Sequence, residues 1–160
     1  MATSAVEADK GGANGRYDVL IVGAGHAGVQ AAASLRQLGY DGSIALAGEE
    51  ADLPYERPPL SKEYLAGDKP FERIVLKPAR FYADRDIDLL SGRRVVGLDA
   101  LARTVALADD TRLGFGTLIW ATGGSPRGLS CDGYQLPGTH TIRTRADIDR
   151  LQGEIGRAHV

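Results

Sequence analysis

The sequence lacks several features that would define its class at once. Its single cysteine, Cys131, supports neither a disulfide nor a metal site, and its three histidines, His26, His140 and His159, are too scattered to bind one metal ion. No apolar run is long enough to span a membrane. With a net charge of −2, nothing in the sequence suggests the clustered basic surface that nucleic-acid binding requires. What is present is an ordinary globular composition, 43% hydrophobic and 25% charged, with room for one domain.

We expect no targeting signal at the beginning of the chain. Residues 1–16 are small, polar and rich in glycine, without the apolar stretch of a signal peptide or a membrane anchor. This composition predicts a disordered tail, and a cytoplasmic location is the expectation that follows.

The most informative stretch follows this tail. An apolar run over residues 17–22 ends in a Gly-x-Gly-x-x-Gly pattern and passes directly into an alanine-rich stretch with helical spacing. The pattern predicts a buried parallel strand that turns sharply into a helix. Gly23 would permit the turn, Gly25 would let the backbone approach a pyrophosphate, and Gly28 would let the helix pack closely on the strand. Because the N–H groups at the helix start would face the phosphates, the sequence predicts a dinucleotide site.

An acidic turn follows the next expected strand, residues 43–47. Glu49 lies 49 − 28 = 21 residues after Gly28, where a carboxylate would meet a ribose hydroxyl. The alternative is a structural β-α-β unit whose acidic turn is merely solvated. The glycines do not decide between nicotinamide and flavin dinucleotides, because both kinds fit the same turn.

The remaining runs predict a sheet of two parts. A helix that begins at Pro78 and a third parallel strand, residues 87–90, continue the β-α-β pattern. A last buried strand, residues 118–122, precedes a Gly-Gly turn, and Trp120 within it is expected in the core rather than facing a cofactor. The turn at residues 109–110 lacks the glycine of a tight hairpin, so we expect it to be longer or strained. Three short β-rich runs should form an antiparallel meander laid over the parallel sheet: 94–98, 104–108 and 112–115.

The most specific stretch is the segment of residues 54–62, which contains Pro-Tyr-Glu-Arg-Pro-Pro-Leu-Ser-Lys. The paired prolines restrict the backbone, and Pro59 suits the first position of a short helix that would run to about Ala66 and stop at Gly67. This stiffness would position Arg57 before the prolines and Lys62 one turn into the helix. For either cation taken alone, a solvated surface position is the alternative.

This segment resembles the corresponding block of the flavin-dependent ferredoxin reductases, the relatives of putidaredoxin reductase and of apoptosis-inducing factor. Residues 63–67, 117–127 and 140–144 are similar to the same family, and the resemblance covers residues 17–151. It implies an α/β fold, the FAD/NAD(P)-binding Rossmann-like three-layer fold with a parallel sheet and an antiparallel β-meander crossover, here truncated.

The resemblance implies a flavoprotein oxidoreductase that passes electrons from NAD(P)H through FAD to an iron–sulfur carrier of the ferredoxin or rubredoxin type. Disulfide reductases need a cysteine pair near the flavin, which Cys131 alone does not supply. Two alternatives stay open: a redox-responsive FAD-binding protein of the apoptosis-inducing factor type, and a partial flavin-binding module without turnover.

The resemblance also implies roles for individual residues. Arg57 would reach the adenine-side phosphate or ribose, and Lys62, the expected catalytic residue, would lie near the flavin ring and stabilise the negative charge that develops there. The implied cofactor-binding set is Gly23, Ala24, Gly25, His26, Ala27, Gly28, Glu49, Glu50, Arg57, Lys62, Val96, Ala121, Thr122, Gly123 and Arg127.

Three segments are therefore expected. Residues 1–16 are the tail, and residues 17–153 are the incomplete N-terminal part of an FAD-binding domain, since no second glycine-rich unit for a nicotinamide follows. Residues 154–160 match the translation of a common sequencing-library adapter, and we hypothesise that they carry no biological information. The residues that would distinguish NADH from NADPH are not within the sequence.

Overall fold

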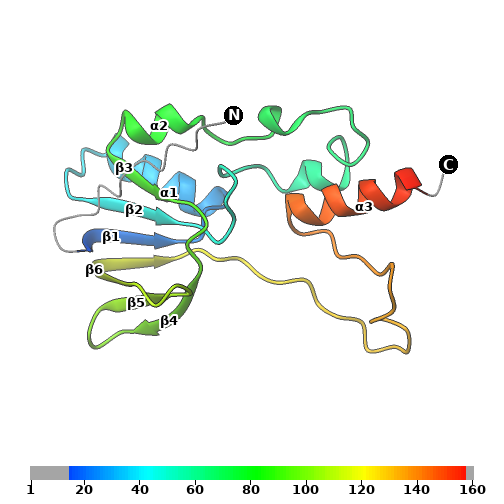
Figure 1. The fold of residues 1–160 in the computed structure, drawn as a ribbon. Coiled ribbons are helices and arrows are strands. Elements are labelled where there is room, and N and C mark those ends of the chain that lie inside the picture. The colour runs from blue at the N-terminus through cyan, green and yellow to red at the C-terminus, as the bar shows by residue number, and fades with distance from the viewer. Residues whose placement is uncertain (1–14, 158–160) are drawn as a thin grey trace, which may run out of the picture.

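The computed structural model describes residues 15–157, in which helices cover one face of a central sheet (Figure 1). The expected tail lies outside the described residues except for Gly15 and Arg16, and Arg16 begins the first strand. Within the described part, no helix is long and apolar enough to cross a membrane. The elements are β1 (Arg16–Val22), α1 (His26–Gln37), β2 (Ile44–Ala47), η1 (Pro58–Ser61), η2 (Phe71–Arg73), α2 (Ala79–Ala83), β3 (Ile87–Leu90), β4 (Val95–Asp99), β5 (Thr104–Leu107), β6 (Arg112–Trp120) and α3 (Arg145–Arg157).

Six strands form one sheet in the order β3-β2-β1-β6-β5-β4. Strands β3, β2, β1 and β6 are parallel, whereas β5 pairs antiparallel with both β6 and β4. Strand β1 is central in the parallel half, where Leu20 and Ile21 are fully buried in the cores on opposite faces. Burial on both faces explains the unbroken apolar run in its sequence.

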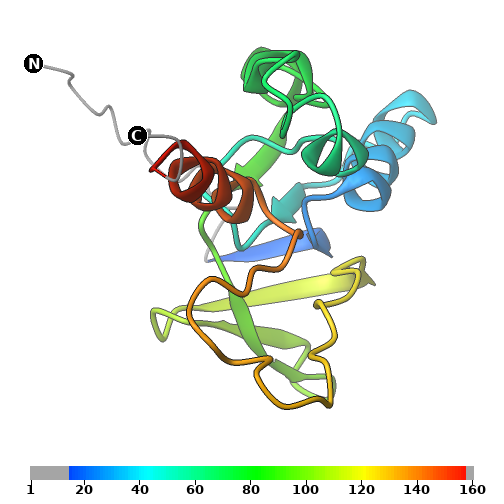
Figure 2. The same ribbon diagram turned by 90° about the vertical axis from the view of Figure 1, so that its right-hand side faces the viewer.

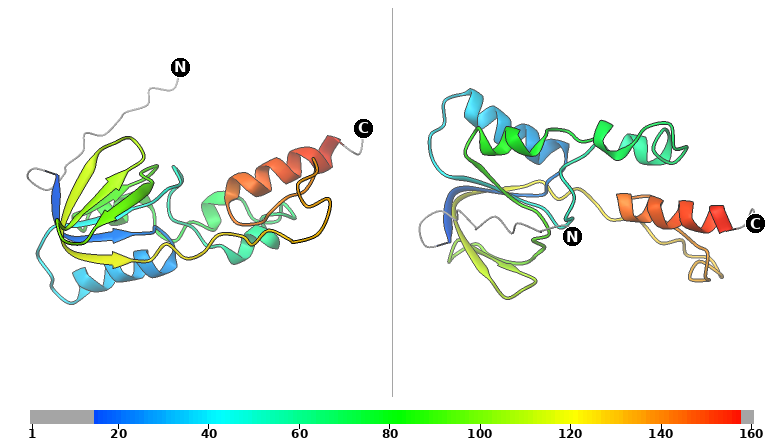
Figure 3. Two further views of the ribbon diagram at one scale, coloured as in Figure 1. Left: turned by 90° about the horizontal axis from the view of Figure 1, so that it is seen from below. Right: turned by 45° about the horizontal axis from the view of Figure 1, so that its top comes forward.

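Two apolar cores hold the layers together. On one face of the sheet, Val29 and Ala32 of α1 and Tyr82 of α2 pack against β1, β2 and β3. On the other face, Val105 and Leu107 of β5 belong to the same core as residues of β1 and β2. Figure 3 shows the helices and the meander on opposite sides of the parallel strands. The predicted three-layer fold with a meander crossover is therefore confirmed.

The third meander strand and the last parallel strand are one element, which corrects the prediction of two strands at 112–115 and 118–122. Strand β6 runs unbroken from Arg112 to Trp120, and Gly114 pairs with β5 on one side and with β1 on the other. Two glycines interrupt its apolar pattern, and glycine is depleted in strands. A Cβ atom at Gly116 would lie 2.7 Å from the carbonyl oxygen of Asp18, so close approach to β1 requires that residue.

A third apolar cluster lies beyond the carboxyl edge of the sheet. It consists of Tyr55, Leu60, Ile74 and Ile148, each at most 3% exposed. Ile148 belongs to α3, which the chain reaches through an extended arm after β6, residues 121–144. Figures 1 and 2 show α3 beside the segment that contains η1.

The proline block forms a shorter helix than the sequence predicts. Instead of a helix from Pro59 to about Ala66, the chain forms the 3₁₀ helix η1 and then a series of turns. The N–H of Lys62 bonds to the carbonyl of Pro59 at 3.0 Å, an i to i−3 bond typical of a 3₁₀ helix. Gly67 does end the segment, with a φ of +80°.

Two local predictions have opposite outcomes. The prediction that Trp120 lies in the core is wrong. This last residue of β6 is 53% exposed, because it lies beyond the part of the strand that the two cores cover.

The predicted strain in the turn at residues 109–110 is confirmed, because Asp110 has a φ of +64° in the left-handed region. The carboxylate of Asp109 stabilises this turn by accepting a hydrogen bond of 3.1 Å from the backbone N–H of Thr111.

The contact between α1 and β1 gives a direct test of the fold. A Cβ atom at Gly28 would lie 2.0 Å from the carbonyl oxygen of Gly23, whereas a Cβ atom at Gly25 would meet nothing within 4 Å. We expect Gly28→Ala to lower the free energy of unfolding by about 1–3 kcal/mol, the usual cost of overpacking. Gly25→Ala should cost less than about 1 kcal/mol. Urea unfolding followed by circular dichroism measures both, and equal losses would contradict the packing of α1 on β1.

Candidate dinucleotide site

Three backbone turns meet where the parallel strands end. The N–H of Gly23, after β1, donates to the carbonyl of Ala47 at the end of β2 at 2.8 Å. The N–H of Ala121, after β6, donates to the carbonyl of Val22 at 2.7 Å. These bonds bring the ends of β1, β2 and β6 side by side, at the edge where open α/β sheets bind ligands.

The three glycines of the β1–α1 turn have different surroundings. Gly23 has a φ of +114°, and a Cβ atom there would lie 2.2 Å from the carbonyl oxygen of Ala121. Gly28 allows the helix to touch the turn, as described above. Gly25 faces open space, so a side chain at this position would occupy the volume next to the exposed backbone. Gly23 and Gly28 therefore pack against the protein backbone, whereas Gly25 faces solvent.

The start of α1 offers free backbone donors to that open space. Gly25 is the N-cap of this 12-residue helix, and no side chain caps it. The first turn contains no acidic residue, and His26 and Ala27 are exposed. Because the first N–H groups of a helix have no intrahelical partners and the helix dipole is positive there, this end can bind an anion. Ala24 packs closely against Gly48, which follows β2. A Cβ atom at Gly48 would lie 2.7 Å from the Cβ atom of Ala24.

The two glutamates of the acidic turn have different partners. Glu49 is exposed and forms a loose ion pair of 3.5 Å with Arg94, next to β4. The carboxylate of Glu50 accepts a hydrogen bond of 2.5 Å from the hydroxyl of Tyr55 and pairs with Arg57 at 2.5 Å. The sequence spacing favoured Glu49 for the ribose. The structure brings Glu50, and not Glu49, together with the proline block.

Arg57 is held by three contacts. Besides Glu50, its guanidinium donates to the hydroxyl of Tyr55 and to the backbone carbonyl of Arg143, both at 2.8 Å. Burial and the hydrogen bond to Glu50 raise the pKa of Tyr55, so its hydroxyl stays protonated and keeps donating to the carboxylate. Arg57 therefore reaches the acidic turn as expected, and its contact with a phosphate or ribose stays a prediction.

The other expected site residues lie around the same edge or on the arm. Lys62 is exposed after η1, and its side chain makes no hydrogen bond or ion pair within residues 15–157. Val96 is 60% exposed at a β-bulge of β4, a feature that reorients a side chain. Thr122 and Arg127 are exposed on the segment after β6. The structure does not bring Arg127 into contact with the glycine turn.

Arg143 joins the site although sequence reasoning gave it no role. Its Nη2 atom lies 2.8 Å from the position of a Cβ atom at Gly123, whose φ is +70°. Arg143 is a half-buried residue and forms no ion pair within the described residues. Because no carboxylate neutralises its charge, Arg143 can bind an anionic ligand at this edge of the sheet. Its place in a stretch similar to the reductases was the one signal that could have identified it.

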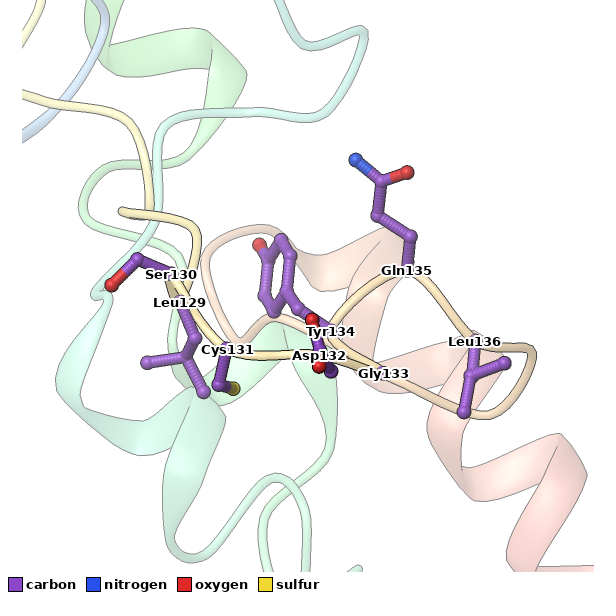
Figure 4. A pocket seen from close by; sticks show the side chains of 8 residues that line it. All are labelled: Leu129, Ser130, Cys131, Asp132, Gly133, Tyr134, Gln135 and Leu136. Atoms are coloured by element: carbon purple, nitrogen blue, oxygen red, sulfur yellow. The ribbon is translucent and has the colours of Figure 1, made fainter.

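Figure 4 shows a hollow on the arm that is formed by a single loop, residues 129–136. Leu129 and Leu136 border it and are 67% and 64% exposed, and Cys131 is an exposed free thiol. No other element lines this hollow, and it does not include any residue of the glycine turn. It is therefore separate from the candidate site.

These features define a dinucleotide-binding α/β protein, and comparison with known proteins gives the family. The chain matches the pyridine nucleotide-disulphide oxidoreductase family over residues 17–160. It is 55% identical over 139 residues to a ferredoxin–NAD(P)(+) reductase of Sphingomonas sp., a match of 87% of this chain and 34% of that protein.

Solved structures agree in fold. A ferredoxin reductase of Rhodopseudomonas palustris has a TM-score of 0.81 at 40% identity, over 90% of this chain and 35% of that one. Putidaredoxin reductase, solved in a covalent complex with putidaredoxin, has a TM-score of 0.74 at 34% identity, over 89% of this chain and 34% of that one. The chain belongs to the pyridine nucleotide-disulphide oxidoreductase family, and it spans about a third of the length of the relatives it matches.

The contacts of Arg57 predict a stability difference between two arginines of the site. Arg57→Gln removes hydrogen bonds that involve a half-buried charge, so we expect it to lower the free energy of unfolding by about 1–2 kcal/mol. Arg94→Gln is the matched control, because its ion pair with Glu49 is mostly exposed and should contribute less than about 0.5 kcal/mol. Urea unfolding midpoints of the two variants test this. Arg57 would not be the anchor of the acidic turn if both variants unfolded like the wild type.

Proposed function

We propose that this chain forms the FAD-binding part of a flavoprotein oxidoreductase that passes electrons from NAD(P)H through FAD to an iron–sulfur carrier of the ferredoxin or rubredoxin type. The observation that carries the proposal is the open backbone at Gly25 beside the uncapped start of α1. The electron donor and the class of acceptor in this proposal are those named for the reductases to which the chain is similar.

The residues present fit FAD. The backbone at Gly25, His26 and Ala27 would receive the pyrophosphate, since a Cβ atom at Gly25 would fill the space that the phosphates need. A carboxylate of the acidic turn, Glu49 or Glu50, would bind the adenosine ribose. The bulge at Val96 would border the adenine.

The flavin half would lie toward the end of β6. Ala121, Thr122 and Gly123 form that end, and Gly123 allows close approach of backbone to ligand. Arg143, whose guanidinium lies next to Gly123, would neutralise negative charge on the phosphates or on the flavin. Lys62 is the proposed catalytic residue, which would hold a positive charge beside the flavin ring.

The protein's own part in catalysis is binding and orientation. The chemistry that bound FAD supplies is two-electron reduction by NAD(P)H and one-electron delivery to an iron–sulfur centre. The glycine turn would fix the pyrophosphate, and the charges of Arg143 and Lys62 would favour the reduced, more negative form of the flavin. Cys131 lies in the arm loop with no cysteine partner, which supports direct electron exit rather than disulfide chemistry.

We further propose that the chain is the N-terminal part of a longer reductase, with residues 17–153 as an incomplete FAD-binding domain. The coverage of about a third of each relative supports this division. Helix α3 continues to Arg157, beyond the expected boundary at 153, and the assignment of residues 154–160 to adapter sequence stays a prediction. A cytoplasmic location belongs to the proposal, because NAD(P)H is an intracellular reductant.

FAD binding is the first test of this function. In the full-length protein, we expect Gly25→Val to lose most of its flavin, because a branched side chain would occupy the path of the pyrophosphate. The measurement is flavin absorbance retained after gel filtration. Gly153→Val is the control, because a Cβ atom at that position also meets nothing within 4 Å but lies in α3. Wild-type flavin content in Gly25→Val would refute the site.

Turnover is the second test. The full-length protein should oxidise NAD(P)H with a ferredoxin- or rubredoxin-type acceptor. The 160-residue chain should not exceed the rate of free FAD with ferricyanide as acceptor, since donor and flavin would not be held together. NAD(P)H oxidation by the short chain above that background would contradict the proposed division of the protein. Failure of the full-length protein with every iron–sulfur carrier would contradict the proposed reaction.

A further inference from the structure

We propose that Tyr55 is a positioning residue of the dinucleotide site: its hydroxyl orients the carboxylate of Glu50 and the guanidinium of Arg57 and joins both to the start of α3. The inference rests on the proposed function, because it concerns how tightly FAD is bound. Tyr55 touches no proposed part of FAD itself, and it would act through the two charged residues.

The hydroxyl of Tyr55 uses its full hydrogen-bonding capacity. It donates to Oε2 of Glu50 at 2.5 Å, and it accepts from Nη1 of Arg57 and from the backbone N–H of Arg145, both at 2.8 Å. A phenol has one hydrogen to donate and can accept two bonds. Three segments therefore meet at one oxygen atom: the acidic turn after β2, the proline block and the first residue of α3.

The ring of Tyr55 gives that oxygen a fixed position. The residue is 3% exposed and packs with Leu60, Ile74 and Ile148. Its ring also meets Phe71 edge-on, with centroids 5.4 Å apart. A side chain enclosed in this way has one rotamer available, so its hydroxyl is held by the third apolar cluster.

Glu50 and Arg57 do not have this support on their own. Both belong to irregular segments, and their side chains keep 27% and 30% of their surface exposed. An ion pair with this exposure orients its partners weakly, because long side chains can pair in several geometries. The guanidinium also lies 4.6 Å from the centre of the Tyr55 ring, so the same residue restrains it on a second side. We infer that the buried phenol selects the geometry of the pair.

Tyr55→Phe in the full-length protein is the test. The change removes one oxygen atom and leaves Glu50 and Arg57 paired, so it releases their orientation and also the bond from the backbone N–H of Arg145, which the control below addresses. We expect FAD affinity, measured by quenching of flavin fluorescence on titration of the apoprotein, to fall about tenfold, because Glu50 loses the hydrogen bond that orients its carboxylate toward the ligand.

Tyr64→Phe is the matched control. Its hydroxyl also holds α3, through Asp149 at 2.5 Å and Nε of Arg145 at 3.2 Å, but it contacts neither Glu50 nor Arg57. FAD affinity should change less than about twofold in this variant. Equal losses in Tyr55→Phe and Tyr64→Phe would overturn the inference, because both would then act only through the docking of α3.

A double-mutant cycle with Glu50→Gln separates positioning from general stability. If Tyr55 acts through Glu50, the loss caused by Glu50→Gln should be several-fold smaller in the Tyr55→Phe background than in the wild type. Additive losses would overturn the inference, and so would an unfolded Tyr55→Phe apoprotein by circular dichroism. A wild-type apoprotein that binds no FAD would overturn the proposed function together with this inference. Wild-type affinity in Tyr55→Phe would overturn this inference alone.

Discussion

The site depends on close backbone contact at the end of β1. Gly23 lies against Ala121 of the segment after β6, and Gly28 brings α1 against Gly23, with no room for a Cβ atom at either glycine. This contact places the start of α1 directly above the parallel strands. The helix N–H groups then point to the open side of Gly25, where an anion can approach. Because β1 and β6 are adjacent in the sheet, the same contact also places the Gly123 turn beside the start of α1.

Beyond the edge of the sheet, α3 and the proline block form a second body of the molecule around the third apolar cluster. Arg145, the first residue of α3, adds contacts to the neighbouring segments: it pairs with Asp52 at 2.8 Å and lies 4.2 Å from the centre of the Phe71 ring of η2. Glu50, in the turn after β2, connects this body to the sheet through its hydrogen bonds with Tyr55 and Arg57. A ligand that binds the acidic turn would therefore contact the joint between two cores. Its binding energy would also favour the docked position of the second body.

The sequence determined the parallel β-α-β unit and the meander well, because unbroken apolar runs and a glycine turn have few other solutions. It was less informative where glycines interrupt a strand, as at Gly114, or where the proline block forms a 3₁₀ helix in place of a longer α-helix. The exposure of Trp120 was missed, because an apolar strand residue does not show where its covering layer ends. Tyr55 and Arg143 received no role, because each has a contact with a residue 86 or 90 positions away, which no local pattern records.

The two halves of the proposed FAD site differ in how firmly the protein holds their residues. On the adenine side, Glu50 and Arg57 are already engaged with each other and with a buried hydroxyl. On the flavin side, Lys62 and Trp120 are exposed, and Lys62 has no polar side-chain partner within residues 15–157. Ordering residues on binding costs free energy, so a preorganised contact contributes more to affinity than a mobile one. The adenine half should therefore supply most of the affinity of this chain for FAD, and the flavin half should depend on contacts that Lys62 gains only with the cofactor.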